Sequence, residues 1–301
     1  MKKPVFHGVI PPVVTVFDKN GRLDIKGNCM QADFLIGHGV DGLAYLGTTG
    51  EFGALTLEEK CDFLWQMTEY VSGRVKVLAG VSDTCLENVL FLIRHCERIG
   101  VNGILLLPPY FSVYSSEMLA AYFSYIASST ELPVILYNFP ALTGFDMEAG
   151  WVKELALKHQ NIAGIKETVT DVLHIREMLK IKKERPDFAV FAAYDDQFLD
   201  VIREPCVDGF IHASGNFAPE PAAVLCQAAQ NGNEDLMRSA FRRVLTGMKV
   251  YSLSQPLFLA VKEAVYQRVL GYEGGERLPA LPLSAKQKKE VKTILSELEK
   301  G

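Results

Sequence analysis

Two side chains with complementary chemistry, a tyrosine and a lysine, lie at the ends of two short apolar runs. The run Pro133–Asn138 contains Tyr137, and the run Ile162–Lys166 ends on Lys166. Burial favours the unprotonated form of an amine, which attacks ketones to form Schiff bases. A phenol within reach can pass protons to and from the carbinolamine that precedes the Schiff base. The pair predicts amine-based carbonyl chemistry; the simpler alternative is a lysine whose stem packs while its ammonium reaches water.

The residues between these two runs predict how the pair is positioned. A turn marked by proline and glycine covers Phe139–Gly144, and residues 146–159 have the apolar spacing of an amphipathic helix. A strand, a helix and a second strand in this order form a unit whose strands are parallel neighbours. We therefore expect Tyr137 and Lys166 side by side, at the same end of adjacent strands.

The same alternation of apolar runs and amphipathic segments occupies the first 214 residues. The strands that we expect are Gly8–Val16, Gly42–Gly47, Val75–Gly80, Gly103–Pro108, Pro133–Asn138, Ile162–Lys166, Phe188–Tyr194 and Gly209–Ser214. Helical periodicity covers about 25–38, 57–72, 84–99, 115–128, 146–159, 171–184 and 195–203. Thr56 with Glu59 has the spacing of a capping box, and Ser115 is a second expected cap.

Eight strands that alternate with helices favour an α/β fold of the (β/α)8 TIM-barrel type, with residues 1–217 in the barrel. A doubly wound open sheet is the alternative, but no GxGxxG motif follows the first strand. Residues 218–301 have no strand pattern, and we expect them to form a C-terminal helical extension packed on the barrel. Its expected helices lie near 219–231, 233–250, 256–270 and 284–299.

Composition narrows the class of partner. The chain has 301 residues, of which 49% are hydrophobic, and its net charge of −5 argues against nucleic acid or an anionic membrane as a partner. The chain start lacks the features of a signal peptide, and no apolar run is long enough to span a bilayer. Six cysteines without CxxC spacing indicate reduced core residues and a cytoplasmic protein. The six histidines lack HxH or HxxxH spacing, so we expect no metal site.

In a TIM barrel, the C-terminal ends of the strands form the reactive face. The polar residues that we expect there, besides Tyr137 and Lys166, are Thr48, Thr49, Tyr110, Asp195, Asp196 and Ser214. The loop Gly47–Glu51 places two hydroxyl residues between two glycines, so its backbone N–H groups can form a nest for a carboxylate or a phosphate. No basic residue that a phosphate would recruit is evident nearby. A carboxylate next to a ketone, as in a 2-keto acid, fits this loop together with Lys166.

At these positions the sequence resembles the dihydrodipicolinate synthase/N-acetylneuraminate lyase family of class I aldolases, over the whole chain. Three motifs carry the resemblance: Gly47–Glu51, Tyr137–Gly144 and Gly164–Glu167. The resemblance implies that Lys166 forms the Schiff base with pyruvate without another cofactor, and that Tyr137 transfers protons. It further implies that Thr48 and Thr49 hold the pyruvate carboxylate, that Ile211 offers a backbone carbonyl, and that the protein is a homotetramer built as a dimer of dimers.

Two departures from the family pattern bear on the substrate. The synthases have an arginine for aspartate semialdehyde in the turn after the tyrosine, and Leu142 stands there. A second tyrosine, which a neighbouring subunit commonly supplies, is replaced by Phe111, so that Tyr110 or Tyr114 would have to substitute for it. Leu142 is as in the sugar-acid lyases, and the Tyr194–Asp196 loop resembles their hydroxyl-binding loop. Tyr137–Gly144 followed by Ala213–Pro219 most resembles the 2-keto-3-deoxygluconate aldolase branch.

We therefore expect a lyase that cleaves a 2-keto-3-deoxy sugar acid to pyruvate and an aldehyde. The alternatives are a synthase that condenses pyruvate with aspartate semialdehyde, and an N-acetylneuraminate lyase. A non-catalytic keto-acid-binding protein is a third, which the intact lysine and tyrosine disfavour. A metal-dependent aldolase is disfavoured by the scattered histidines.

Overall fold

Eight parallel strands form the centre of the protein in a computed structural model that describes residues 3–203 and 206–300. The strands are β1 (Gly8–Val9), β2 (Gly42–Tyr45), β3 (Lys76–Gly80), β4 (Gly103–Leu106), β5 (Val134–Asn138), β6 (Ile162–Glu167), β7 (Ala189–Ala192) and β8 (Gly209–Phe210). From β2 to β8 each strand pairs with the next one in chain order, and β8 also pairs with β1. The segment after β1 joins β2 through a parallel bridge between Pro12 and Ala44, so the sheet curls into a barrel. The expected TIM-barrel class is confirmed.

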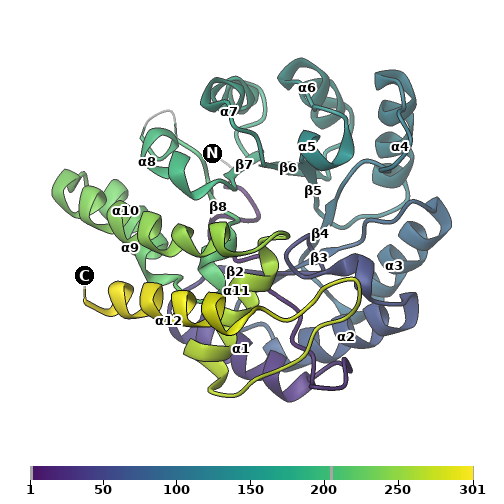
Figure 1. The fold of residues 1–301 in the computed structure, drawn as a ribbon. Helices are drawn as coiled ribbons and strands as arrows, with labels where there is room; N and C mark the ends of the chain where they lie inside the picture. The colour runs from purple at the N-terminus through teal and green to yellow at the C-terminus, as the bar shows by residue number, and fades with distance from the viewer. Residues whose placement is uncertain (1–2, 204–205, 301) are drawn as a thin grey trace.

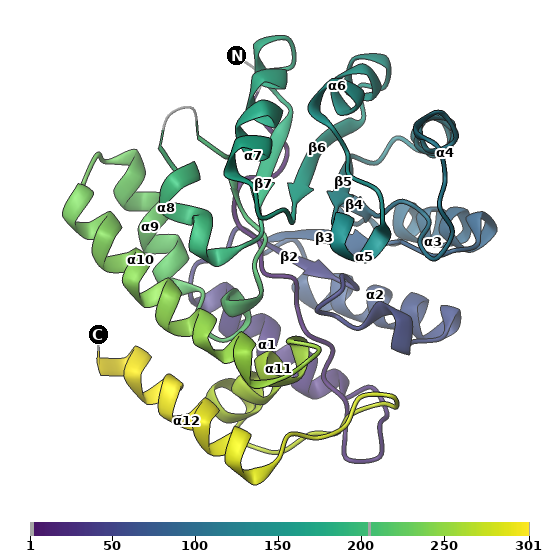
Figure 2. The same ribbon diagram turned by 45° about the horizontal axis from the view of Figure 1, so that its top comes forward.

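Helices surround these strands on the outside (Figures 1 and 2). They are α1 (Ile25–Gly37), α2 (Leu57–Val71), α3 (Leu86–Ile99), α4 (Ser116–Ser128), α6 (Ala149–Lys158), α7 (Val172–Leu179) and α8 (Phe198–Val201). The short helix α5 (Pro140–Thr143) lies instead at the C-terminal end of β5 (Figure 2). The capping box of Thr56 and Glu59 begins α2, and the Ser115 hydroxyl caps α4, as the sequence predicts.

Alternation along the strands divides the apolar side chains into two layers. One buried cluster fills the barrel interior and includes Ile135, Tyr137 and Ile211. A larger cluster lies between the strands and the helices and includes Leu136 and Ile165. Because side chains alternate along a strand, Lys166 follows the outward Ile165 and faces the interior. Tyr137 and Lys166 are thus on the inner side of the sheet.

The chain after β8 is helical, as expected. It forms α9 (Glu220–Gln230), α10 (Glu234–Met248), α11 (Phe258–Val265) with a π-helical continuation at Tyr266–Leu270, and α12 (Ala285–Lys300). Helix α9 contacts β1 and α10, and α12 lies beside α10 and α11 (Figure 1). A separate apolar cluster, with Val261 and Leu295 among its members, holds α11 and α12 against Val14 and Val16, whereas α9 and α10 pack on the larger cluster. The boundary at residue 217 between barrel and extension stays a prediction.

The first strand is much shorter than the expected Gly8–Val16. Pro11 and Pro12 lack the N–H groups that a regular ladder needs, so pairing as a strand ends at Val9. The chain nonetheless continues along β2, where Val13 donates a backbone hydrogen bond to Ala44. No helix in the described part of the chain is long and apolar enough to cross a membrane.

Candidate active site

The strand register brings the tyrosine and the lysine together. Tyr137 on β5 is the direct partner of Lys166 on β6. The Lys166 Nζ atom lies 4.0 Å from the centre of the Tyr137 ring, and both side chains are only 3% exposed. The Tyr137 hydroxyl is 3.3 Å from the Thr48 hydroxyl, at hydrogen-bond distance. An amine, a phenol and an alcohol thus adjoin one another at the C-terminal ends of three strands.

These groups open into one cavity of about 850 Å³. Of the residues expected at the site, Thr48, Thr49, Tyr137, Lys166, Asp195 and Ile211 line it. Leu142 also lines it and is 60% exposed. The segment from Met248 to Phe258, at the end of α10 and the start of α11, forms another part of the wall. The cavity thus lies between the barrel rim and the C-terminal helices.

The loop with the two threonines has residues on both sides whose backbone adopts a conformation that is rare for residues other than glycine. Leu46, just before it, has φ = 57°, and Glu51, at its end, has φ = 53°. Both values lie in the left-handed region, which costs energy for residues other than glycine. Gly50 has no room for a side chain, because a Cβ atom there would lie 2.8 Å from the Val13 carbonyl oxygen. Its own carbonyl accepts a 2.6 Å hydrogen bond from the buried Thr15 hydroxyl.

Asp195 is at the cavity wall, but its carboxylate is already engaged by protein groups. One oxygen accepts a hydrogen bond from the Ser214 hydroxyl and lies 3.0 Å from His212 Nδ1. The other oxygen accepts a 2.9 Å hydrogen bond from the Tyr251 hydroxyl. These hydrogen bonds join the ends of β7 and β8 to the C-terminal helices. Burial, with the Asp195 charge as a further cause, raises the pKa of Tyr251 well above its ordinary value, so Tyr251 remains a donor.

Three residues expected at the site do not line the cavity. Asp196 is exposed to solvent, and Ser214 is 2% exposed and turned toward Asp195. The Tyr110 ring packs edge-on against Phe52, with 6.0 Å between ring centres. Burial raises the pKa of Tyr110. Sequence position at a strand end thus brings a residue to the rim without deciding which way its side chain points.

Two further residues that line the cavity were not singled out from the sequence as candidates in their own right. Thr168 lies two residues after Lys166 and so faces the same side. Its hydroxyl is buried and has no hydrogen-bond partner among the described residues. Tyr194 also lines the cavity, and burial raises its pKa. The alternation rule could have pointed to Thr168, because it follows Lys166 at a spacing of two.

A second polar group supports the pair from the outer side of the strands. Asn138 donates hydrogen bonds to Glu167 at 3.0 Å and to Asp146 at 2.8 Å. His174 on α7 lies 3.4 Å from the Glu167 carboxylate and 3.2 Å from that of Asp146. Burial raises the pKa of Glu167, and contact with Glu167 raises the pKa of His174. Tyr137 and Lys166 are therefore each followed in their strand by a residue of this buried network, Asn138 and Glu167.

Within residues 3–203 and 206–300, no group of three or more histidine, cysteine, aspartate or glutamate side chains could hold a metal ion. The fold and the site define a TIM-barrel protein with an inward-facing lysine and tyrosine at the C-terminal ends of its strands. A family model agrees with this class: residues 5–298 match the dihydrodipicolinate synthetase family. The chain belongs to this family and is a carbon–carbon lyase.

Individual relatives match this chain over nearly its full length. The chain is 38% identical to the candidate 2-dehydro-3-deoxy-D-gluconate aldolase YagE of Escherichia coli K12, over 98% of this chain and 97% of that protein. It is also 38% identical to the candidate 2-dehydro-3-deoxy-D-pentonate aldolase YjhH of the same organism, with 98% of each chain covered.

Solved structures agree with these matches. The structure of YagE in complex with pyruvate has a TM-score of 0.93 and covers 98% of this chain and 99% of that one. Dihydrodipicolinate synthase from Thermotoga maritima has a TM-score of 0.91 at 30% identity, with 98% and 99% covered.

Proposed function

We propose that this protein is a class I aldolase that cleaves a 2-keto-3-deoxy sugar acid to pyruvate and an aldehyde. One observation carries the proposal: Lys166, Tyr137 and Thr48 adjoin one another in a single cavity. A Schiff-base reaction needs a nucleophilic amine, a proton-transfer group and a way to hold the keto acid. The complex of YagE with pyruvate supports pyruvate as the keto acid.

The reaction begins at the carbonyl carbon of the substrate. The Lys166 nitrogen attacks C2, and the resulting carbinolamine takes up a proton through Tyr137 and loses water to give an iminium. The C4 hydroxyl then loses its proton, the C3–C4 bond breaks, and its electron pair moves to the iminium to form an enamine. The aldehyde departs. Protonation of the enamine at C3 and attack of water at C2 release pyruvate and restore the amine.

Thr48 and Thr49 are the proposed carboxylate site. Their loop lies next to Tyr137: the Thr48 hydroxyl is 3.3 Å from the Tyr137 hydroxyl, which supports this assignment. Ile211 also lines the cavity and is proposed to offer its backbone carbonyl to the keto acid. Asp196, Ser214 and Tyr110 do not line the cavity in this structure. Their proposed role in substrate binding therefore requires that their side chains change conformation when the substrate binds.

The aldehyde half is proposed to carry hydroxyl groups in place of a carboxylate. Leu142 gives the cavity an apolar side chain where a carboxylate would need a cation. The unpartnered Thr168 hydroxyl and the Tyr194 phenol can exchange hydrogen bonds with substrate hydroxyls. Asp195 acts by fixing the wall through Tyr251, since its oxygens are occupied.

The main alternative is synthesis of 4-hydroxy-tetrahydrodipicolinate from pyruvate and aspartate semialdehyde. It is favoured by the relatives named as synthases, such as that of Thermotoga maritima at 30% identity. Leu142 opposes it, because charge-assisted arginine pairs are among the stronger polar contacts that a site can make. N-acetylneuraminate lyase is a further alternative within the same reaction class.

A panel of substrates separates these reactions. It compares kcat/KM for pyruvate release from 2-keto-3-deoxygluconate, its galactonate epimer, a 2-keto-3-deoxy pentonate and N-acetylneuraminate, and for condensation of pyruvate with aspartate semialdehyde. We expect a 2-keto-3-deoxy sugar acid to give the highest value. A preference of about tenfold or more for the semialdehyde would overturn the sugar-acid assignment.

We also propose that the protein acts as a homo-oligomer, with a tetramer as the expected form. The segment after β4 and helix α4 exposes large apolar side chains: Phe111 is 100% exposed, Val113 95% and Met118 61%. Contiguous exposed apolar side chains are typical of protein interfaces. Sedimentation velocity of the purified protein measures the state directly, and a monomer at assay concentration would contradict the proposal.

A further inference from the structure

The carboxylate of Glu51 points away from the cavity and into the C-terminal helices. It forms an ion pair with Lys262 of α11, which is 0% exposed. Lys262 also lies 2.6 Å from the carboxylate of Glu276. Two carboxylates therefore share one buried ammonium. Glu51 is more than two hundred positions from Lys262 and Glu276 in the sequence, so this cluster joins the end of the threonine loop to the extension.

A neighbouring set of contacts attaches the same part of the chain from another direction. Two cations lie near the Phe17 ring: Lys262 Nζ is 4.8 Å from the ring centre, and the Arg277 guanidinium is 4.5 Å from it. Arg277 donates hydrogen bonds to the Ala54 carbonyl at 2.9 Å and to the Glu59 carboxylate at 2.6 and 2.7 Å. The segment between α11 and α12 thus reaches the start of α2 (Figure 1).

The backbone of Glu51 transmits this attachment to the two threonines. Its N–H group donates a 3.1 Å hydrogen bond to the Thr48 carbonyl, and its own carbonyl accepts a 2.8 Å bond from Ala54. Glycine or asparagine would adopt its left-handed conformation at lower cost. Strained backbone persists only where the surrounding structure holds it, and here the ion pair supplies that hold.

We infer that Glu51 and Lys262 are positioning residues, whose buried ion pair holds the Thr48–Thr49 loop ready to bind the substrate carboxylate. The inference rests on the proposed function, in which this loop binds the carboxylate. Neither residue lines the cavity, so neither touches the substrate. If the ion pair is broken, the loop also adopts conformations that do not bind the substrate carboxylate. The apparent affinity for the substrate then falls in proportion to the fraction of molecules whose loop can still bind it.

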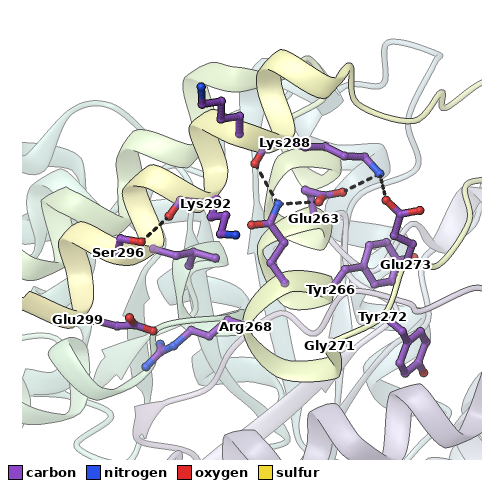
Figure 3. A pocket seen from close by; sticks show the side chains of 13 residues that line it. Glu263, Tyr266, Arg268, Gly271, Tyr272, Glu273, Lys288, Lys292, Ser296 and Glu299 are labelled. Atoms are coloured by element: carbon purple, nitrogen blue, oxygen red, sulfur yellow. Dashed lines mark hydrogen bonds and ion pairs between the residues drawn. The ribbon is translucent and has the colours of Figure 1, made fainter.

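An outer group of charges in the same helices supplies the matched control. Lys288 of α12 lies 2.9 Å from Glu273 and 3.6 Å from Glu263, while Gln267 donates a 2.7 Å hydrogen bond to Glu263 (Figure 3). Lys288, like Lys262, pairs with two carboxylates of the extension. Its contacts within residues 3–203 and 206–300 are with the C-terminal helices and the segment between them, not with the threonine loop, so its loss tests these helices without releasing Glu51.

The test compares Glu51→Gln with Lys288→Met in the full-length protein. The glutamine keeps the shape of the side chain and leaves Lys262 paired with Glu276, so the fold has a counterion for its buried ammonium. Two quantities are measured: KM for the cleaved keto acid, and the pyruvate concentration that gives half-maximal inactivation by borohydride. We expect both to rise about tenfold in Glu51→Gln, with kcat changed less than about threefold, and both to stay unchanged in Lys288→Met.

Unchanged half-saturation in a folded Glu51→Gln protein overturns the inference, and so does an equal rise in the control. If Glu51→Gln does not fold, Lys262→Arg decides, because it keeps the buried charge while altering where Glu51 must sit. Half-saturation is then expected to rise severalfold, and an unchanged value contradicts the inference. A wild-type protein that shows no pyruvate-dependent inactivation refutes the proposed function instead, so the two failures are distinguishable.

Discussion

Lys166 and Lys262 are both withdrawn from solvent, but their surroundings differ in charge. Lys262 is fully buried between two carboxylates. Lys166 is 3% exposed and lies against the Tyr137 ring, with no carboxylate of the described residues within ion-pair distance. An ammonium between two carboxylates has its N–H groups occupied and its charge balanced. Lys166 instead lines the cavity in which we propose that the keto acid binds.

The difference shows why burial alone does not identify a catalytic lysine. A buried lysine with paired carboxylates stabilises the connection of two parts of the fold, whereas one without them is available for chemistry. The partners are what separate the two roles, and they come from residues distant in the sequence. Substitutions at either lysine, or at the groups around it, therefore test this difference.

The largest effect is expected from removal of the amine at the reactive site. Lys166→Met keeps a long side chain and removes the nucleophile, so cleavage should fall below detection while the thermal unfolding temperature stays close to that of the wild type. Steady-state assays and calorimetry measure the two quantities. Turnover that survives in a folded Lys166→Met protein would show that another group forms the Schiff base.

Tyr137→Phe should slow turnover by roughly 10²–10⁴-fold, the usual contribution of a positioned acid–base group. Pyruvate binding should persist, because the ring beside Lys166 remains. Tyr45→Phe is the matched control: Tyr45 is also buried on a strand, but it belongs to the outer apolar cluster. A loss below about tenfold in Tyr137→Phe would assign the proton transfer to another group.

Lys262→Met should have the opposite profile from Lys166→Met. It leaves Glu51 and Glu276 buried without their counterion, so we expect a loss of about 3–5 kcal/mol in the free energy of unfolding. Some cleavage should remain in the folded fraction. Urea unfolding of both variants checks the contrast, and equal stability losses at the two lysines would break it.

Leu142→Arg tests how the wall of the Lys166 cavity selects the aldehyde half. A guanidinium at this position can pair with the carboxylate of aspartate semialdehyde, which should raise its use by roughly 10- to 100-fold relative to sugar-acid cleavage. Leu142→Met is the control, because it changes shape without adding charge. The ratio of the two kcat/KM values is the measurement, and an unchanged ratio would remove Leu142 from the selection of substrate.

The smallest effect concerns the network behind the strands. Contact with Glu167 raises the pKa of His174 above its ordinary value of 6.5. A raised pKa stabilises the fold below the ordinary value, and this stabilisation is lost as the pH rises through the raised one. His174→Asn should therefore cost more stability near pH 6 than near pH 9. Equal costs at the two pH values, in denaturant titrations, would show that protonation of His174 contributes nothing.

The sequence predicts most of the barrel because its two periodicities are local. Apolar runs and amphipathic helices follow from neighbouring residues, and the pairing of Tyr137 with Lys166 follows from one strand–helix–strand unit. Local patterns could not fix the end of β1, where Pro11 and Pro12 interrupt the ladder while the chain continues beside β2.

The orientation of side chains and the contacts between residues distant in the sequence were harder to predict from the sequence. Asp195 and Ser214 were expected at the reactive face, but they bond to each other and, with Tyr251, form a buried network. The pairing of Glu51 with Lys262 spans more than two hundred residues and leaves no periodic signal. Both depend on how the C-terminal helices pack on the rim, which no short segment of sequence determines.

The central claim, that Lys166 and not Lys262 is the reactive amine, is tested most directly by reductive trapping. The wild-type protein is treated with borohydride in the presence and absence of pyruvate, and its peptides are mapped by mass spectrometry. We predict a pyruvate-dependent adduct on the peptide that contains Lys166 and none on the peptide that contains Lys262. An adduct on any other lysine, or no adduct that depends on pyruvate, would contradict the claim.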